Sequence, residues 1–361
     1  MNAHPDFRPP TEPVRPAAGH STRGDGAAIM SVLREPSGPT LSLHGLAPEA
    51  ALRRLELTIV RRLDGFLQGD HLGFLPGPGS DLNDARVYVP GQDDVRRMDW
   101  AVTARTTVPH VRDTIADREL EVWALLDATP SMNWGTSGMT KRDLGIAAIA
   151  TFGFISQKMG DRFGGMIMHN DGITRLQARS GRNALYGLLR RMLADPIQPD
   201  RSPGNFELAD GIEALNRAQQ RRGMRIVVSD FLIPGDAEID PNVPPAWERP
   251  LRRLTVRNQV VCVQVLDAAE IDFPDMGEML IRDPETDFSQ FVDTDQERTR
   301  QAVNAASAAQ RERTAAAIRR AGAGHVVLRT DHDWVADIAR FVLTYRRTAA
   351  VISQPPKGVS I

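Results

Sequence analysis

Apolar runs that alternate with helical segments constrain the fold of this chain more than any other feature. Three of these runs read VWALLD (122–127), MRIVVSD (224–230) and QVVCVQVL (259–266). Strands that are apolar at every position are buried on both faces, which is typical of parallel strands covered by helices. Parallel strands need long crossover connections, and the intervening segments have helical spacing. The sequence therefore predicts an α/β fold with a doubly wound, mostly parallel sheet.

Further elements follow the same alternation. A hairpin is predicted where two strands, 162–168 and 173–178, flank the turn Asn170-Asp171-Gly172. A second hairpin is predicted over 278–293, and HVVLR (325–329) is a further strand. Helices are predicted at 141–159, 182–194, 206–221, 295–321 and from 333 to about 346.

The chain divides into four predicted parts. Residues 1–47 are rich in Pro, Gly, Ser and Arg and have no apolar period, so they are predicted to be a disordered tail. Residues 48–118 are predicted to form a helix, with apolar residues at helical spacing from Leu52 to Phe66, and then a small β-rich module punctuated by Gly and Pro. The α/β domain is predicted over 119–347, and 348–361 form a short tail.

Composition excludes several classes of partner. Forty-four Lys and Arg residues nearly balance 46 Asp and Glu residues, so nothing favours nucleic acid or an anionic membrane surface. No apolar run is long enough for membrane insertion, and no signal-peptide pattern is present. The single cysteine, Cys262, lies in an apolar run and rules out an internal disulfide. We therefore expect a cytoplasmic protein.

Two of the apolar strands end in an aspartate, Asp127 and Asp230, at the edge where ligands of open α/β sheets bind. The first continues as Asp127-Ala128-Thr129-Pro130-Ser131, which places a carboxylate and two hydroxyls at alternate positions of one loop. Oxygen ligands of this kind suit Mg²⁺ or Mn²⁺, so Asp127, Thr129 and Ser131 are predicted to hold the ion and Asp230 to contribute directly or through water. The pattern matches the Asp-x-Ser-x-Ser motif of a metal-ion-dependent adhesion site, with Thr in place of the first Ser. The alternative is that a strand-terminal Asp has a structural role, anchoring its loop without binding a metal.

A second motif precedes the domain, in the stretch RVYVPGQDDVRRMDWAVTAR. It resembles the signature of the domain of unknown function 58 family, which couples such a block to a von Willebrand factor A-like domain. The matching positions are Arg86, Tyr88, Pro90, Gly91, Asp93, Arg96, Asp99, Trp100, Ala104 and Arg105. The resemblance implies a role in complex assembly or maturation beside a MoxR-type AAA+ ATPase. Many relatives carry N-terminal membrane helices, whereas this chain has a polar tail and resembles a soluble branch.

The chain departs from the family pattern at two functional positions. Gln92 stands where the family has the first Asp of a Gly-Asp-Asp turn. The resemblance also implies a Thr as third metal ligand, and the corresponding stretch here offers Asn205, whose amide oxygen is a substitute ligand.

The block itself has two interpretations. Its residues Arg86, Tyr88, Arg96, Asp99, Trp100 and Arg105 either clasp the small module onto the sheet or contact a partner directly. Arg96 and Asp99 are spaced to pair within one helical turn, and Trp100 supplies a large apolar surface. The clasp is the simpler interpretation, and both roles are compatible.

The resulting functional hypothesis is a non-enzymatic adaptor that binds a protein partner through its metal site. Two alternatives stay open: a metal-independent interaction module, and a Mg²⁺-dependent phosphoryl-transfer enzyme with Asp127 as nucleophile. Against an enzyme, the sequence has no zinc-type histidine spacing, no Gly-x-Ser-x-Gly elbow and no phosphate-binding loop. No catalytic residue is therefore assigned.

Overall fold

The computed structural model describes residues 46–66, 85–89, 98–112, 121–156, 162–198, 205–218, 222–232, 243–282 and 289–352. The predicted disordered tail at 1–47 lies almost entirely outside these residues. Within them, no helix combines the length and the apolar character needed to cross a membrane.

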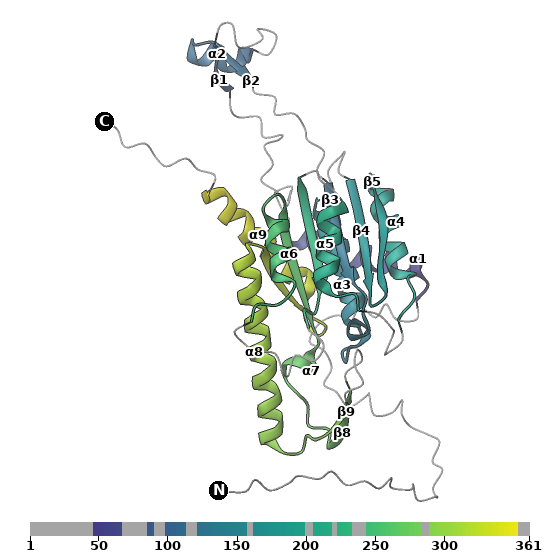
Figure 1. Cartoon of the computed structure of the whole chain (residues 1–361). Helices are drawn as coiled ribbons and strands as arrows, with labels where there is room; N and C mark the ends of the chain where they lie inside the picture. Colours follow the sequence, from purple (N-terminus) through teal and green to yellow (C-terminus); the bar gives the residue numbers. More distant parts are fainter. Residues whose placement is uncertain are drawn as a thin grey trace, which may run out of the picture. The chain divides into compact units, whose positions relative to one another are not determined.

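A six-stranded sheet forms the centre of the fold, in the order β10-β7-β6-β3-β4-β5 (Figure 1). Its strands are β3 (Glu121–Asp127), β4 (Arg162–His169), β5 (Gly172–Ser180), β6 (Gly223–Ser229), β7 (Gln259–Leu266) and β10 (Gly324–Arg329). All neighbours pair in parallel except β4 and β5, which form the predicted hairpin. The predicted α/β class with a mostly parallel sheet is confirmed.

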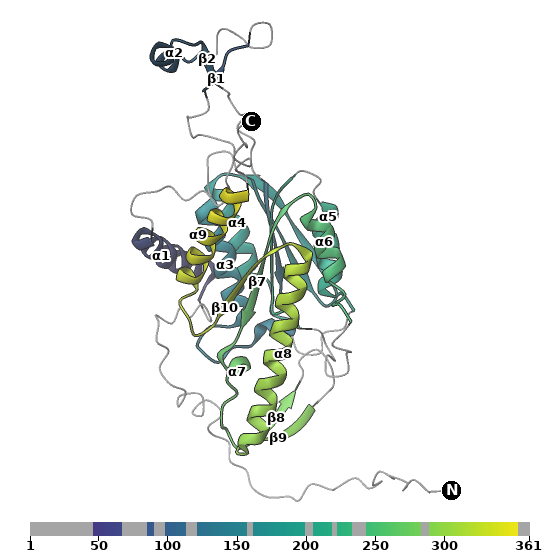
Figure 2. The ribbon, with the colours of Figure 1, turned by 90° about the vertical axis from the view of Figure 1, so that its left-hand side faces the viewer.

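Helices cover both faces of this sheet (Figure 2). One face packs against α3 (Lys141–Ser156), α4 (Arg182–Leu193) and α9 (Trp334–Ile352), and the other against α5 (Leu208–Ala218), α6 (Glu248–Thr255) and α8 (Glu297–Ala321). Helix α1 (Pro48–Phe66) packs on α3, α4 and α9. Alternate residues of each strand serve the two faces: Val122 and Leu126 enter the first core, and Trp123 and Leu125 the second. This explains why β3, β6 and β7 are apolar at most positions.

Helix α1 belongs to the hydrophobic core on the first face of the α/β domain. Its buried residues recur at helical spacing, and the helix packs on α3, α4 and α9. These residues are Ala51, Leu52, Leu55, Ile59 and Leu63. The predicted part 48–118 joins this helix to the β-rich module in sequence, and the apolar stripe of the helix packs on helices of the α/β domain.

The β-rich module contains β1 (Ala85–Val87), the short helix α2 (Trp100–Thr106) and β2 (His110–Arg112). The two strands pair antiparallel. Helix α2 was not predicted, because its seven residues carry no apolar stripe and none of them is buried.

The remaining elements follow the prediction with differences at their ends. Strands β8 (Glu278–Arg282) and β9 (Ser289–Asp293) form the second predicted hairpin. Helix α9 continues to Ile352, past the predicted start of the tail at 348, because no helix breaker occurs before Pro355. The analysis missed α6, α7 (Ala268–Ile271) and the 3₁₀ turn η3 (Pro130–Asn133), all too short for a clear period.

The burial of α1 leads to a test with a matched control. Leu55 is completely buried, whereas Leu57 on the same helix is 49% exposed. Leu55→Ala is expected to lower the free energy of unfolding by about 2–5 kcal/mol, and Leu57→Ala by less than about 0.5 kcal/mol. Urea denaturation of both variants measures this difference. Equal losses would show that α1 does not share the core.

Candidate functional site

Polar side chains gather at the carboxyl edge of the parallel strands. Asp127 ends β3, Ser229 ends β6 and is followed by Asp230, Asp267 follows β7, and Thr330 follows β10. The register places these ends at one edge, because Leu126 pairs with Val228 and Arg329 with Leu266. The edge therefore includes Asp267 and Thr330 in addition to the predicted Asp127 and Asp230.

Among the described residues, the donors to Asp127 are all neutral. Its Oδ1 accepts hydrogen bonds from the backbone N of Thr129 at 3.0 Å and from Thr129 Oγ1 at 2.7 Å. Its Oδ2 accepts from Ser229 Oγ at 2.7 Å. The side chain is nearly buried, with 4% of its surface exposed. Burial, together with the charge of Asp230, raises the pKa of Asp127 to about 6, although the three hydrogen bonds oppose the shift.

The two predicted hydroxyls lie side by side in the loop after β3. Thr129 Oγ1 and Ser131 Oγ are 3.3 Å apart, Thr129 is buried and Ser131 is half-buried. Two adjacent ligands of an octahedral Mg²⁺ ion, each about 2.1 Å from the metal, are about 3.0 Å apart. Because Thr129 donates its hydroxyl proton to Asp127, its oxygen lone pairs stay available. The hydroxyl pair therefore fits a divalent ion.

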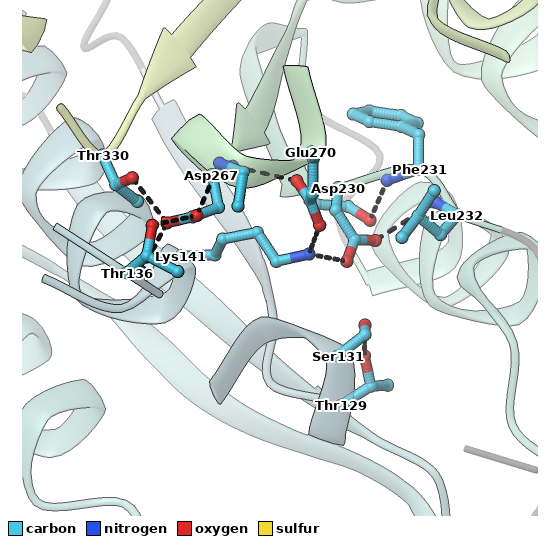
Figure 3. Close-up of polar contacts among 12 residues, drawn as sticks. Thr129, Ser131, Thr136, Lys141, Asp230, Phe231, Leu232, Asp267, Glu270 and Thr330 are labelled. Carbon is cyan, nitrogen blue, oxygen red and sulfur yellow. Dashed lines mark hydrogen bonds and ion pairs between the residues drawn. The ribbon is translucent and has the colours of Figure 1, made fainter. Parts of the chain in front are cut away.

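Asp230 has a cationic partner that the sequence analysis did not assign. Lys141, the first residue of α3, brings its Nζ within 2.8 Å of Asp230 Oδ2 and 2.7 Å of Glu270 Oε1 (Figure 3). Burial disfavours the charged ammonium, but the two carboxylates more than offset this and raise the pKa of Lys141. Burial in turn raises the pKa of Glu270, although Lys141 opposes that shift.

The backbone after Asp230 is constrained. Phe231 is buried and has φ of 59°, a left-handed conformation that is uncommon for an aromatic residue. Its N–H donates to Ser229 Oγ at 2.9 Å, and its ring packs edge-on against Trp247 with 5.2 Å between centroids. Packing therefore holds the turn that positions Ser229 and Asp230.

A third strand-terminal aspartate completes the edge. Asp267 is fully buried and accepts hydrogen bonds from the backbone N of Thr136 at 2.8 Å, from Thr330 Oγ1 at 2.7 Å and from Ala269 N at 3.0 Å. It caps α7, where Glu270 Oε2 accepts from the Asp267 N–H. The sequence signal was present, because the run QVVCVQVL is followed by Asp-Ala-Ala-Glu.

Residues 84–313 match the family model described as "Protein of unknown function DUF58". The chain belongs to this family. An uncharacterized protein of Mycobacterium bovis and an uncharacterized protein of Mycobacterium tuberculosis are each 45% identical over 300 residues, which cover 83% of this chain and 90% of theirs.

Solved structures similar to this DUF58 protein include the conserved hypothetical protein BatB from Bacteroides thetaiotaomicron, with 14% identity and a TM-score of 0.36. That match covers 63% of this chain and 99% of the BatB chain. The SpRpn10 VWA domain matches with 14% identity and a TM-score of 0.32, over 67% of this chain and 100% of the domain.

Asn205, the predicted substitute for the Thr ligand that the family resemblance implies, is exposed in this DUF58 protein and precedes α5. The next residue, Phe206, donates its N–H to the backbone O of Asn170 at 3.0 Å in the β4–β5 turn. The segment therefore lies by the carboxyl end of β4, next to β3. Among the described residues, no group of three or more His, Cys, Asp or Glu side chains is arranged to hold a metal. A ligand role for Asn205 stays a prediction.

The family block is described in part. Asp99 caps α2 by accepting from the backbone N–H groups of Ala101 and Val102, and Trp100 is 68% exposed. Arg105 donates to Ala101 O within the same helix, and the backbone N of half-buried Tyr88 donates to Pro109 O. The side chain of Arg86, and Arg96 with its predicted ion pair, lie outside the described residues. The clasp and partner roles both stay predictions, and the exposure of Trp100 suits the second.

The raised pKa of Asp127 makes stability depend on pH in a defined direction. The folded state holds the proton more tightly than the unfolded state, so this stabilisation is complete below about 3.8 and is lost as pH rises through about 6. A difference of about two pKa units corresponds to about 3 kcal/mol. In EDTA, the wild type is expected to lose up to this amount relative to Asp127→Asn between pH 4 and 7.5. Urea denaturation at both pH values measures it, and a pH-independent difference would contradict the assignment.

Proposed function

We propose that this protein is a non-enzymatic adaptor whose α/β domain binds a protein partner through a divalent ion, Mg²⁺ or Mn²⁺, at the carboxyl edge of the sheet. The observation that carries the proposal is the pair of hydroxyls, Thr129 Oγ1 and Ser131 Oγ, 3.3 Å apart above buried Asp127. When bound, the ion would supply the positive charge that a partner carboxylate needs.

Different residues would bind the ion, orient its ligands and leave room for the partner. Thr129 and Ser131 would hold the ion directly, and Asp127 orients Thr129 through its hydroxyl and its N–H. Ser131 is only half-buried, which leaves room for a partner group on its solvent side. Asp230 would contribute through water, since Lys141 and Leu232 N already contact its two oxygens, and Asn205 is the remaining candidate ligand.

The surroundings of Asp127 support binding over phosphoryl transfer. A nucleophilic carboxylate needs a free, accessible oxygen. Both oxygens of Asp127 accept hydrogen bonds, and the side chain is 4% exposed. Release of phosphate from an aryl phosphate that Asp127→Asn abolishes would favour the enzyme instead.

The proposed partner is a MoxR-type AAA+ ATPase, acting with this protein in complex assembly or maturation. This part rests on the likeness of the block around Asp99 and Trp100 to the family signature, together with family membership. The exposed Trp100 offers a contact for the partner besides the metal. We propose a cytoplasmic location, where the buried thiol of Cys262 would stay reduced.

Metal binding is tested on the hydroxyl pair. Ser131→Ala and Thr129→Val each remove one ligand oxygen and are expected to weaken Mn²⁺ binding at least about tenfold, on the scale of 1.4 kcal/mol. Ser137→Ala, which removes a hydroxyl later in the same loop, is the matched control and should bind as the wild type does. Equilibrium dialysis measures all four proteins. Equal Mn²⁺ affinities of all four proteins would contradict a metal site at the hydroxyl pair and would favour the metal-independent interaction module.

Partner binding is tested by affinity capture from lysate of the native organism. Tagged wild type and Ser131→Ala are compared, each with Mg²⁺ and with EDTA. An AAA+ ATPase is expected with the wild type in Mg²⁺ and at a strongly reduced level in the other three samples. The same ATPase at equal levels in all four samples would contradict the metal-dependent mechanism.

A further inference from the structure

Lys141 places a full positive charge at a point where the buried carboxylate of Asp230 and the half-buried carboxylate of Glu270 converge. Its Nζ is 2.8 Å from Asp230 Oδ2 and 2.7 Å from Glu270 Oε1, and the lysine side chain is 1% exposed (Figure 3). Asp230 follows β6, Glu270 lies in α7 and Lys141 begins α3. The ammonium therefore joins three elements that are far apart in the sequence.

Each carboxylate is fixed independently of the lysine. Asp230 Oδ1 accepts from the backbone N of Leu232 at 3.1 Å, and Glu270 Oε2 accepts from the backbone N of Asp267 at 2.9 Å. One oxygen of each group is thus held by the backbone, and the other is directed at the ammonium. Two fixed carboxylate oxygens that converge on one point are an arrangement that divalent cations bind.

Lysine is an unfavourable choice for this position on general grounds. The first turn of a helix favours acidic residues, because the helix dipole is positive there. A buried ion pair also contributes little net stability, and apolar residues of similar volume often replace one without loss. A positive charge at Lys141 is therefore better explained by what it does to Asp230 and Glu270 than by stability.

We propose that Lys141 is a tethered cation that fills the position where Asp230 and Glu270 would otherwise bind a second divalent ion, and so confines metal binding to Thr129 and Ser131. Lys141 is in this sense a residue that determines the number of ions at the edge. Only the ion at Thr129 and Ser131 rests on the proposed function, because the converging carboxylates of Asp230 and Glu270 do not depend on it.

The test is the number of Mn²⁺ ions bound per chain, measured by equilibrium dialysis and by electron paramagnetic resonance of free Mn²⁺. Lys141→Met keeps the unbranched stem as far as Cε and removes the ammonium with its charge, so it is expected to bind one ion more than the wild type. Lys141→Arg keeps the charge and should match the wild type. Lys141→Met combined with Glu270→Gln removes one of the two carboxylates and should lose the additional ion.

The outcomes separate this inference from the proposed function. If the wild type binds no Mn²⁺ and Lys141→Met binds one ion, the inference stands and the proposed metal site fails. If both bind the same number, the inference is wrong whatever that number is. Removing the ammonium leaves the buried charge of Asp230 and the half-buried charge of Glu270 without their cation and destabilises the fold, so each variant is also followed by circular dichroism and thermal unfolding. A Lys141→Met protein that folds only with Mn²⁺ supports the proposal, and one that stays unfolded in saturating Mn²⁺ overturns it.

Discussion

Buried carboxylates at the ends of parallel strands are the constraint on which the rest of this edge depends. Asp127, Asp230 and Asp267 are each at most 4% exposed, and a buried charge costs several kcal/mol unless partners compensate it. Each one is compensated differently. Asp267 receives hydroxyl and backbone donors from Thr136 and Thr330 among others, and Asp230 receives an ammonium. Within the part of the chain that the structure describes, Asp127 receives neutral donors.

This unequal compensation indicates where a cation would be bound. Asp230 already faces a full positive charge, so an added ion would gain less from it. No described residue supplies such a partner to Asp127, and burial raises its pKa to about 6, which disfavours its charged form. The Thr129 hydroxyl donates to Asp127 Oδ1 and lies 3.3 Å from Ser131 Oγ, so the two hydroxyls lie beside this carboxylate. The electrostatics and the donor positions therefore favour the same loop.

The order of strands and helices could be predicted because it depends on local patterns. Apolar runs with residues such as Val122 and Leu126 predict buried strands, and the Asn170-Asp171-Gly172 turn predicts the hairpin. The ends of strands could likewise be predicted, which brought Asp127 and Asp230 together. Lys141 could not be placed in this way, because it is the first residue of a helix and its partners come from two other connections. Only the fold brings Lys141 and Glu270 together, 129 positions apart in the chain.

The geometry of the edge depends in turn on the register of the sheet, which both cores fix. A slip of one residue in β3 would exchange Trp123 with its neighbours between two faces that are both fully packed. Gly164 on β4 lies beside this tryptophan, and a Cβ there would come within 2.8 Å of the indole. The space that Gly164 leaves therefore helps to seat Trp123, and with it the register that sets Asp127 beside Ser229. The positions of the site oxygens are in this way determined by apolar packing at the centre of the sheet, and a core substitution is capable of disturbing the site without contacting it.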